Sequence, residues 1–186
     1  MAITAKHTIS PKTVELIVYI TTKWKDKPKC GATHLNKALC FSDVLSYLKT
    51  GNQITDLTYI KQDFGPTPNP RQFLSIRNFL IEHGDVELID LNYFGQIQKR
   101  LVPKRHPDLD LFTKDEIVLV DEVLEEISEK NAVELSEYSH RFLAYDAADE
   151  KEEMPLFSFL LTSVDPEPED YEWAEKSIKA YEASNQ

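Results

Sequence analysis

The stretch of the sequence that most restricts the fold is GPTPNP, from Gly65 to Pro70, where three prolines and a glycine occupy six positions. A proline fixes its own φ angle, removes an amide donor and pushes the residue before it toward extended geometry. Asn69 and Pro70 also form a helix-start signal, a capping residue followed by proline at the first helical position. We therefore predict that Gly65–Pro68 is a rigid lead-in to a helix ending near Gly84, with direct contact to a partner as the alternative role.

Similar signals predict the other main helices. Ser10 precedes a proline and a run of apolar residues at helical spacing, which predicts a first helix. Thr33 is expected to cap a second helix that carries apolar residues on more than one side and stops at Gly51, so this helix should be central. Thr113 and Glu116 have the spacing of a capping box, which predicts an amphipathic helix after them.

The one clear β signal follows the proline-rich region. A strand is predicted to begin at Val86, with a turn over Asn92–Gly95 and a return strand over Gln96–Val102. Residues 131–142 are expected to form a short helix, and residues 154–162 an extended segment or short strand. The predicted fold class is mainly α with a small β element (α+β), a compact helical domain of about five to six helices with a β-hairpin or small antiparallel sheet.

The length of the chain and the absence of repeats and long linkers indicate one domain. The chain has 186 residues, which suffices for one hydrophobic core. No internal repeat and no linker long enough to separate two domains is present, so residues 1–186 are expected to form a single domain. Residues 151–186 are interpreted as an extended segment plus an acidic C-terminal helix.

Charge is distributed unevenly along the chain. Residues 1–107 carry 15 basic and 9 acidic side chains, a net +6, whereas residues 108–186 carry 6 and 23, a net −17. An acidic half repels phosphate and attracts basic partners, although solvated helix faces give the same pattern. Two basic runs, Lys23–Lys29 around Trp24 and Lys99–Arg105, are interpreted as solvated loop faces, with nucleic-acid contact as the alternative.

Compartment and chemistry are indicated by what the sequence lacks. The N-terminal region has no long apolar core and no small-residue cleavage site, so a cytoplasmic location is expected. Cys30 and Cys40 are then expected to be reduced thiols. Metal-ligand spacings and phosphate-binding glycine loops are missing, so we expect no enzyme activity, no metal and no cofactor. Ser139 and His140 are adjacent in sequence, which does not make a catalytic pair; a hydrolase using His140 is kept as an alternative.

Four segments resemble one known family. They are NKALCFSD (Asn36–Asp43), GNQITDLTY (Gly51–Tyr59), DFGPTP (Asp63–Pro68) and ELSEYSH (Glu134–His140). Their order and spacing resemble the Panacea domain, the SocA-like antitoxin domain of bacterial and phage toxin–antitoxin systems. The resemblance covers about residues 10–150. It departs from the family pattern at Cys40, Asp56, Phe64 and Tyr145.

The resemblance implies function by binding. Panacea domains neutralise diverse toxins by direct protein contact, and a SocA-like member is an adaptor that delivers its toxin to a protease. The expected partner is thus a cognate toxin protein, with a protease as a further possible partner. No helix-turn-helix unit precedes the Panacea-like region, so nucleic-acid binding is not expected. The residues expected to contact the partner are those of the matching motifs: Asp43, Tyr59, Phe64, Gly65, Pro66, Pro68, His140 and Tyr145.

Overall fold

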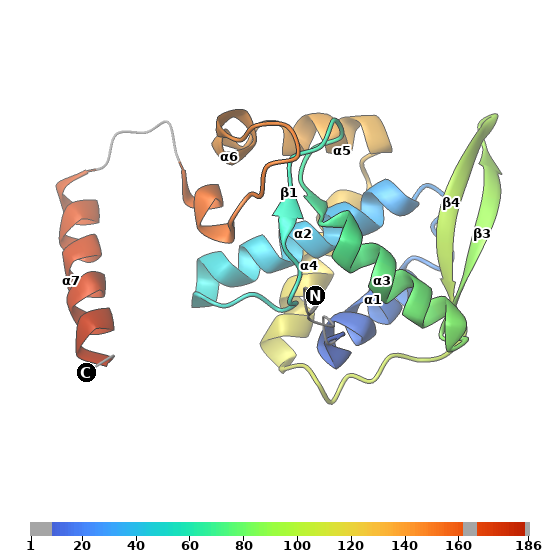
Figure 1. Ribbon diagram of the computed structural model, residues 1–186, viewed down its shortest axis with the longest axis horizontal. Coiled ribbons are helices and arrows are strands. Elements are labelled where there is room, and N and C mark those ends of the chain that lie inside the picture. Colours follow the sequence, from blue (N-terminus) through green and yellow to red (C-terminus); the bar gives the residue numbers. More distant parts are fainter. Residues whose placement is uncertain (1–8, 162–166, 185–186) are drawn as a thin grey trace, which may run out of the picture.

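A computed structural model describes residues 9–161 and 167–184 (Figure 1). The described residues form seven α-helices, one 3-10 helix and two small antiparallel sheets. The predicted fold class, mainly α with a small β element, is therefore confirmed. In chain order the elements are α1 (Pro11–Lys23), α2 (Ala32–Thr50), β1 (Tyr59–Ile60), β2 (Thr67–Pro68), α3 (Pro70–Glu82), β3 (Val86–Tyr93), β4 (Gln96–Pro103), α4 (Lys114–Ser128), α5 (Ala132–Ser139), α6 (Leu143–Ala147), η1 (Leu156–Leu160) and α7 (Pro168–Ser184).

Helix α2 is the centre of the fold, as its apolar residues predicted. Ala38, Leu39 and Cys40 are fully buried, and the helix packs against α1, α4, α5, β2, β4 and η1. Its start differs from the prediction, because Gly31 and not Thr33 is the N-cap. Glycine has no side-chain oxygen, so the sequence carries no capping signal at Gly31. Thr33 lies inside the first turn of the helix.

The remaining cap signals formed helices as predicted. Ser10 and Asn69 accept a backbone amide at the starts of α1 and α3, each followed by proline. Thr113 and Glu116 make the capping box of α4. A second capping box, which the sequence analysis had not identified, starts α5 at Asn131. These local bonds fix where each helix begins. Packing then decides how the helices lie: α1, α4 and α5 pack against α2, and α3 packs against β2 and β3.

The predicted β-hairpin is present as β3 and β4, paired from Val86↔Pro103 to Tyr93↔Gln96. Figure 1 shows it at one end of the molecule, with its tip directed away from the helices. Val86 is buried at its base, whereas Phe94 at its tip is 91% exposed. Leu101 and Arg100 of β4 are buried as well, and the two strands pack against α1, α2 and α3. The hairpin thus joins the core through the half next to its base, while its tip projects.

The C-terminal part differs from the prediction. Residues 154–162 were expected to be extended, but Leu156–Leu160 form the 3-10 helix η1, which packs on α2; Thr162 lies outside the described residues. Phe159 of η1 contacts Phe142, and this burial favours a tight turn over a strand. The predicted acidic helix is present as α7, which Figure 1 draws apart from the other helices. No helix in the described ranges is long and apolar enough to cross a membrane.

Candidate functional site

The proline-rich stretch forms the end of a very small β-hairpin. Strands β1 and β2 pair Tyr59 with Pro68 and Ile60 with Thr67, and the loop over residues 61–66 connects them. We call residues 61–68 the proline corner. Within it the amide of Gly65 donates to the carbonyl of Gln62 at 2.7 Å, which closes a tight turn with Gly65 at φ +90°. Only glycine adopts this φ without steric cost.

Side chains from three helices donate hydrogen bonds to carbonyl groups of this loop. The Lys37 amine of α2 donates to Pro66 at 2.9 Å, and the Ser136 hydroxyl of α5 donates to Phe64 at 3.3 Å. The Tyr145 hydroxyl of α6 donates to Gln62 at 3.1 Å. These bonds satisfy carbonyls that the short β-ladder leaves unpaired, and they fix the loop to the helical body.

The floor of the corner is tightly packed. A Cβ added to Gly65 would lie 2.5 Å from the Lys37 nitrogen and closer still to the Ser139 hydroxyl. Lys37 is itself almost completely buried, and burial lowers the pKa of its amine to about 8. The loop therefore rests on a buried polar floor that has no room for a larger residue at position 65.

Residues 151–154 hold the other side of the corner. The amide of Lys61 donates to the carbonyl of Glu152, and the amide of Met154 donates to the carbonyl of Tyr59. Ile60 and Glu153 form an antiparallel bridge. The first arm of the corner is consequently held between β2 and this later segment.

Beneath the corner lies a buried hydrogen-bond network centred on Asp43. Its carboxylate accepts from the backbone amides of Ile54 and Thr55 at 2.8 and 2.9 Å, from the Thr55 hydroxyl, and from the Tyr59 hydroxyl at 2.6 Å. Burial raises the pKa of both Asp43 and Tyr59, because the charged form of each is disfavoured away from water. The network fixes the start of β1 and hence the position of the corner.

The exposed side of the corner is formed by aromatic and imidazole rings. The Phe64 side chain is 69% exposed although its backbone is fixed. The His140 ring stacks on Tyr145, with 4.3 Å between centroids and 13° between planes. The Lys61 amine lies 4.4 Å from the Tyr145 ring centroid and donates to the Ala148 carbonyl. We call Phe64, His140, Tyr145 and Lys61 the corner surface.

The structure divides the predicted partner-contacting residues into two groups. Phe64 is exposed at the corner, and His140 and Tyr145 are half-buried beside it. The other five, which are Asp43, Tyr59, Gly65, Pro66 and Pro68, are buried and support it. Sequence reasoning missed Lys37, Ser136 and Lys61. Lys37 and Ser136 belong to the motifs NKALCFSD and ELSEYSH, which was the available signal, but a lysine is expected at the surface and was not considered.

The adjacent residues Ser139 and His140 do not form a catalytic pair in the structure. The Ser139 hydroxyl is buried and donates to the Ser136 carbonyl at 2.8 Å, while the His140 ring is turned onto Tyr145. Over residues 9–161 and 167–184, no three histidine, cysteine, aspartate or glutamate side chains are grouped as a metal site requires. Cys30 and Cys40 are free and buried, and burial raises the pKa of Cys40 to about 12.

Three of the four lysines in the first basic run contact α4 or its C-terminal end, and Lys25 is exposed. Lys23 pairs with Asp121 at 2.9 Å, Lys27 donates to the Ser128 hydroxyl, and Lys29 donates to a backbone carbonyl at the end of α4. These lysines hold the loop after α1 against an acidic helix. This arrangement favours the interpretation as a structural loop over phosphate binding.

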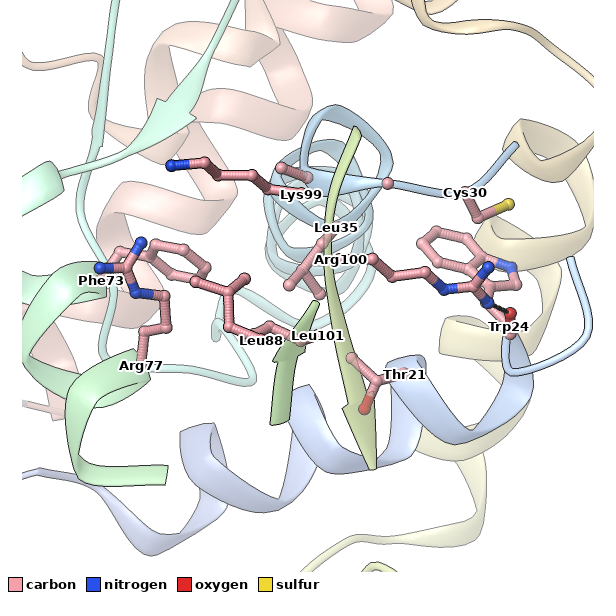
Figure 2. Close-up of a pocket in the computed structure, with 12 residues that line it drawn as sticks. Thr21, Trp24, Cys30, Leu35, Phe73, Arg77, Leu88, Lys99, Arg100 and Leu101 are labelled. Atoms are coloured by element: carbon pink, nitrogen blue, oxygen red, sulfur yellow. Dashed lines mark hydrogen bonds between the residues drawn. The ribbon is translucent and has the colours of Figure 1, made fainter. Parts of the chain in front are cut away.

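The two arginines of the second basic run contact acceptors within the protein. Figure 2 shows the Arg100 guanidinium beside Trp24, whose carbonyl accepts from it, at the edge of an apolar cavity of about 100 Å³ under the hairpin. Arg105 makes ion pairs with Glu15 and Asp85, each at 2.6 Å. Lys104 pairs with Glu87, so three of the four cationic groups are occupied by protein acceptors, and Lys99 is exposed.

Comparison with known proteins gives one match. The family described as "Antitoxin SocA-like, Panacea domain" matches residues 35–144, more than half of the chain. This range includes most of α2, the proline corner, the hairpin and α5. No curated protein and no solved structure gives a significant match.

Proposed function

Because this chain belongs to the antitoxin SocA-like, Panacea domain family, we propose that it is an antitoxin that neutralises a cognate toxin by direct protein–protein contact. The function requires binding and no catalysis. We place it in the cytoplasm, where a toxin and its antitoxin would meet. Residues 1–186 act as one domain in this proposal. Residues 10–150 are the antitoxin core, and residues 151–186 are an extended segment plus an acidic C-terminal helix, of which residues 151–160 pack against that core.

The observation that carries the proposal is the exposed Phe64 on a fixed backbone. Aromatic side chains supply much of the energy at protein interfaces. A side chain on a backbone that is already ordered loses less conformational freedom when it binds, so more of its contact energy appears as affinity. The hydrogen bonds from Lys37, Ser136 and Tyr145 provide this order before a partner arrives.

The proposal assigns two roles to the predicted residues. Phe64, His140 and Tyr145, with Lys61 beside them, contact the toxin. The buried group (Asp43, Tyr59, Gly65, Pro66 and Pro68) positions this surface. His140 takes part in this surface through the stacking of its ring on Tyr145.

Co-expression with the product of the adjacent reading frame tests the proposal. Cells that carry both proteins should grow, and the tagged chain should co-purify with the toxin in a stable complex. Two matched variants each remove one exposed phenylalanine. Phe64→Ala removes it from the corner surface, and Phe94→Ala removes it from the hairpin tip, outside that surface. Only the first should weaken the complex.

The same experiment separates neutralisation from delivery to a protease. In the adaptor mechanism growth returns while the toxin's half-life falls sharply in the presence of this chain. An unchanged toxin half-life together with a stable complex supports direct neutralisation. Absence of both rescue and complex would rule out the antitoxin proposal for this pair of proteins.

A further inference from the structure

An apolar groove lies on the face of α2 that meets α4, α5 and the start of α6. Its volume is about 370 Å³, and it is open to solvent. Its walls are mainly aliphatic and aromatic, formed in part by Phe41, Leu45, Leu48, Val123, Tyr138 and Phe142. It uses different residues from the corner surface, although both use α5 and α6.

The aromatic wall of the groove is preformed. Phe41, Tyr138 and Phe142 make mutual ring contacts with centroids 5.8 to 6.2 Å apart. Leu48 and Tyr138 nevertheless remain 46% and 37% exposed. A concave patch of apolar residues that stays exposed within a folded chain is typical of a protein-binding surface.

The rim of the groove is acidic. Glu122 and Glu126, one turn apart on α4, line it. Each makes an exposed ion pair, Glu122 with Lys49 at 3.3 Å and Glu126 with Lys130 at 2.5 Å, and such pairs are weak enough to be exchanged for a partner's cations. Helices α4 and α5 together carry eight acidic side chains and one basic one.

We propose that this groove binds one amphipathic, basic helix of the toxin, so that the inference rests on the proposed function and adds the partner's chemistry. A groove between helices fits the apolar stripe of an amphipathic helix. Lysine or arginine residues flanking that stripe would meet Glu122 and Glu126. The apolar contact gives affinity, and the charges select the partner and its orientation.

Charge also decides against the two other occupants. Helix α7 carries apolar residues, among them Tyr171 and Ile178, but its five acidic side chains outnumber its two lysines, so the helix has a net charge of −3. A second copy would bring the acidic helices α4 and α5 against the same rim. Like charges would then face one another across the groove.

The test compares matched variants of the full chain for affinity to the purified toxin. Leu48→Glu places a charge in the groove, and Leu74→Glu makes the same change on α3, where Leu74 is 42% exposed and does not line the groove. We expect Leu48→Glu to weaken binding by about tenfold or more and Leu74→Glu by less than about twofold. Thermal unfolding and circular dichroism verify that both variants are folded.

A second pair of variants tests the charge. Glu122→Gln combined with Glu126→Gln should weaken binding by about threefold and flatten its salt dependence, whereas Glu125→Gln on the same helix should change neither.

A wild-type affinity in Leu48→Glu, or equal losses in Leu48→Glu and Leu74→Glu, would overturn the proposal that the groove binds the toxin, while the antitoxin function stands. Tighter binding by Leu48→Glu would identify α7 or a second copy as the occupant. A wild-type chain that does not bind the toxin overturns the proposed function itself.

Discussion

The molecule exposes two phenylalanines on turns, and their surroundings differ. Phe64 lies on the proline corner, whose carbonyls accept hydrogen bonds from residues 29, 72 and 83 positions away. Phe94 lies at the tip of the β3–β4 hairpin, where the anchor is the Asn92 side chain, three positions from the Gly95 amide it binds. Exposure alone therefore does not distinguish a binding surface from a loop tip.

What distinguishes the two turns is the origin of their order. The proline corner is fixed by side chains of three helices, so its geometry depends on the whole fold. The hairpin tip is fixed by its own sequence, and the rest of the fold could change without altering it. Of these two turns, the corner is the one whose aromatic surface is held in place by the rest of the fold before a partner binds.

The largest expected contrast is between the two anchoring side chains. Asp43→Ala removes the acceptor of four buried hydrogen bonds and should lower the free energy of unfolding by about 3–5 kcal/mol. Asn92→Ala removes one exposed bond at the tip and should cost less than about 1 kcal/mol. Urea unfolding of both variants measures this difference, and similar losses would contradict it.

The next contrast concerns the buried Lys37 and its dependence on pH. Burial lowers the pKa of its amine to about 8 from 10.5 in the unfolded chain. The unfolded chain therefore binds more protons between these two values, and the free energy of unfolding rises with pH across the window, by on the order of 3 kcal/mol.

The Lys37→Met variant should lose this rise. Lys99→Met, which changes an exposed lysine of the hairpin, should keep it. Urea unfolding at pH 7.5 and at about pH 10.5 gives the difference for each protein. If Lys37→Met shows the wild-type pH dependence, the rise does not come from the Lys37 amine. The claim that this amine is buried beneath the corner would then be contradicted.

A third contrast uses the two turn glycines, which both have positive φ. Gly65→Ala combines the backbone strain with overlap against Ser139 and Lys37, and should cost about 2–4 kcal/mol. At Gly95 an added Cβ meets no atom within 4 Å, so Gly95→Ala should cost only about 1 kcal/mol. Thermal unfolding of the two variants gives the comparison, and equal shifts would mean that strain alone matters.

The same division between local and distant causes explains what the sequence could predict. The helix starts at Ser10, Asn69 and Thr113 and the hairpin from Val86 were predictable, because each depends on residues a few positions apart. The motif that contains Phe64 was found as well. Its resemblance to a family located the corner but did not show how the corner is held.

The remainder depends on contacts that no local pattern encodes. Lys37 was overlooked because a lysine on a helix is expected at the surface, and its acceptor, Pro66, is far along the chain. Asp43 was expected at the partner surface, whereas burial on all sides makes it part of the interior. The turn at Leu156–Leu160 was predicted as extended because its apolar run has no helical period, and only packing on α2 decides its shape.

The smallest change in stability should accompany a clear difference in binding. Phe64→Ala and Phe94→Ala each remove an exposed ring, so each should shift the free energy of unfolding by less than about 0.5 kcal/mol. Toxin affinity should fall by about tenfold or more for Phe64→Ala and by less than about threefold for Phe94→Ala, measured by calorimetry on purified proteins. Because both variants lose the same side chain, a difference reports the surroundings of the ring. Equal losses would show that exposure is sufficient, and the fixed backbone of the corner would then have no part in recognition.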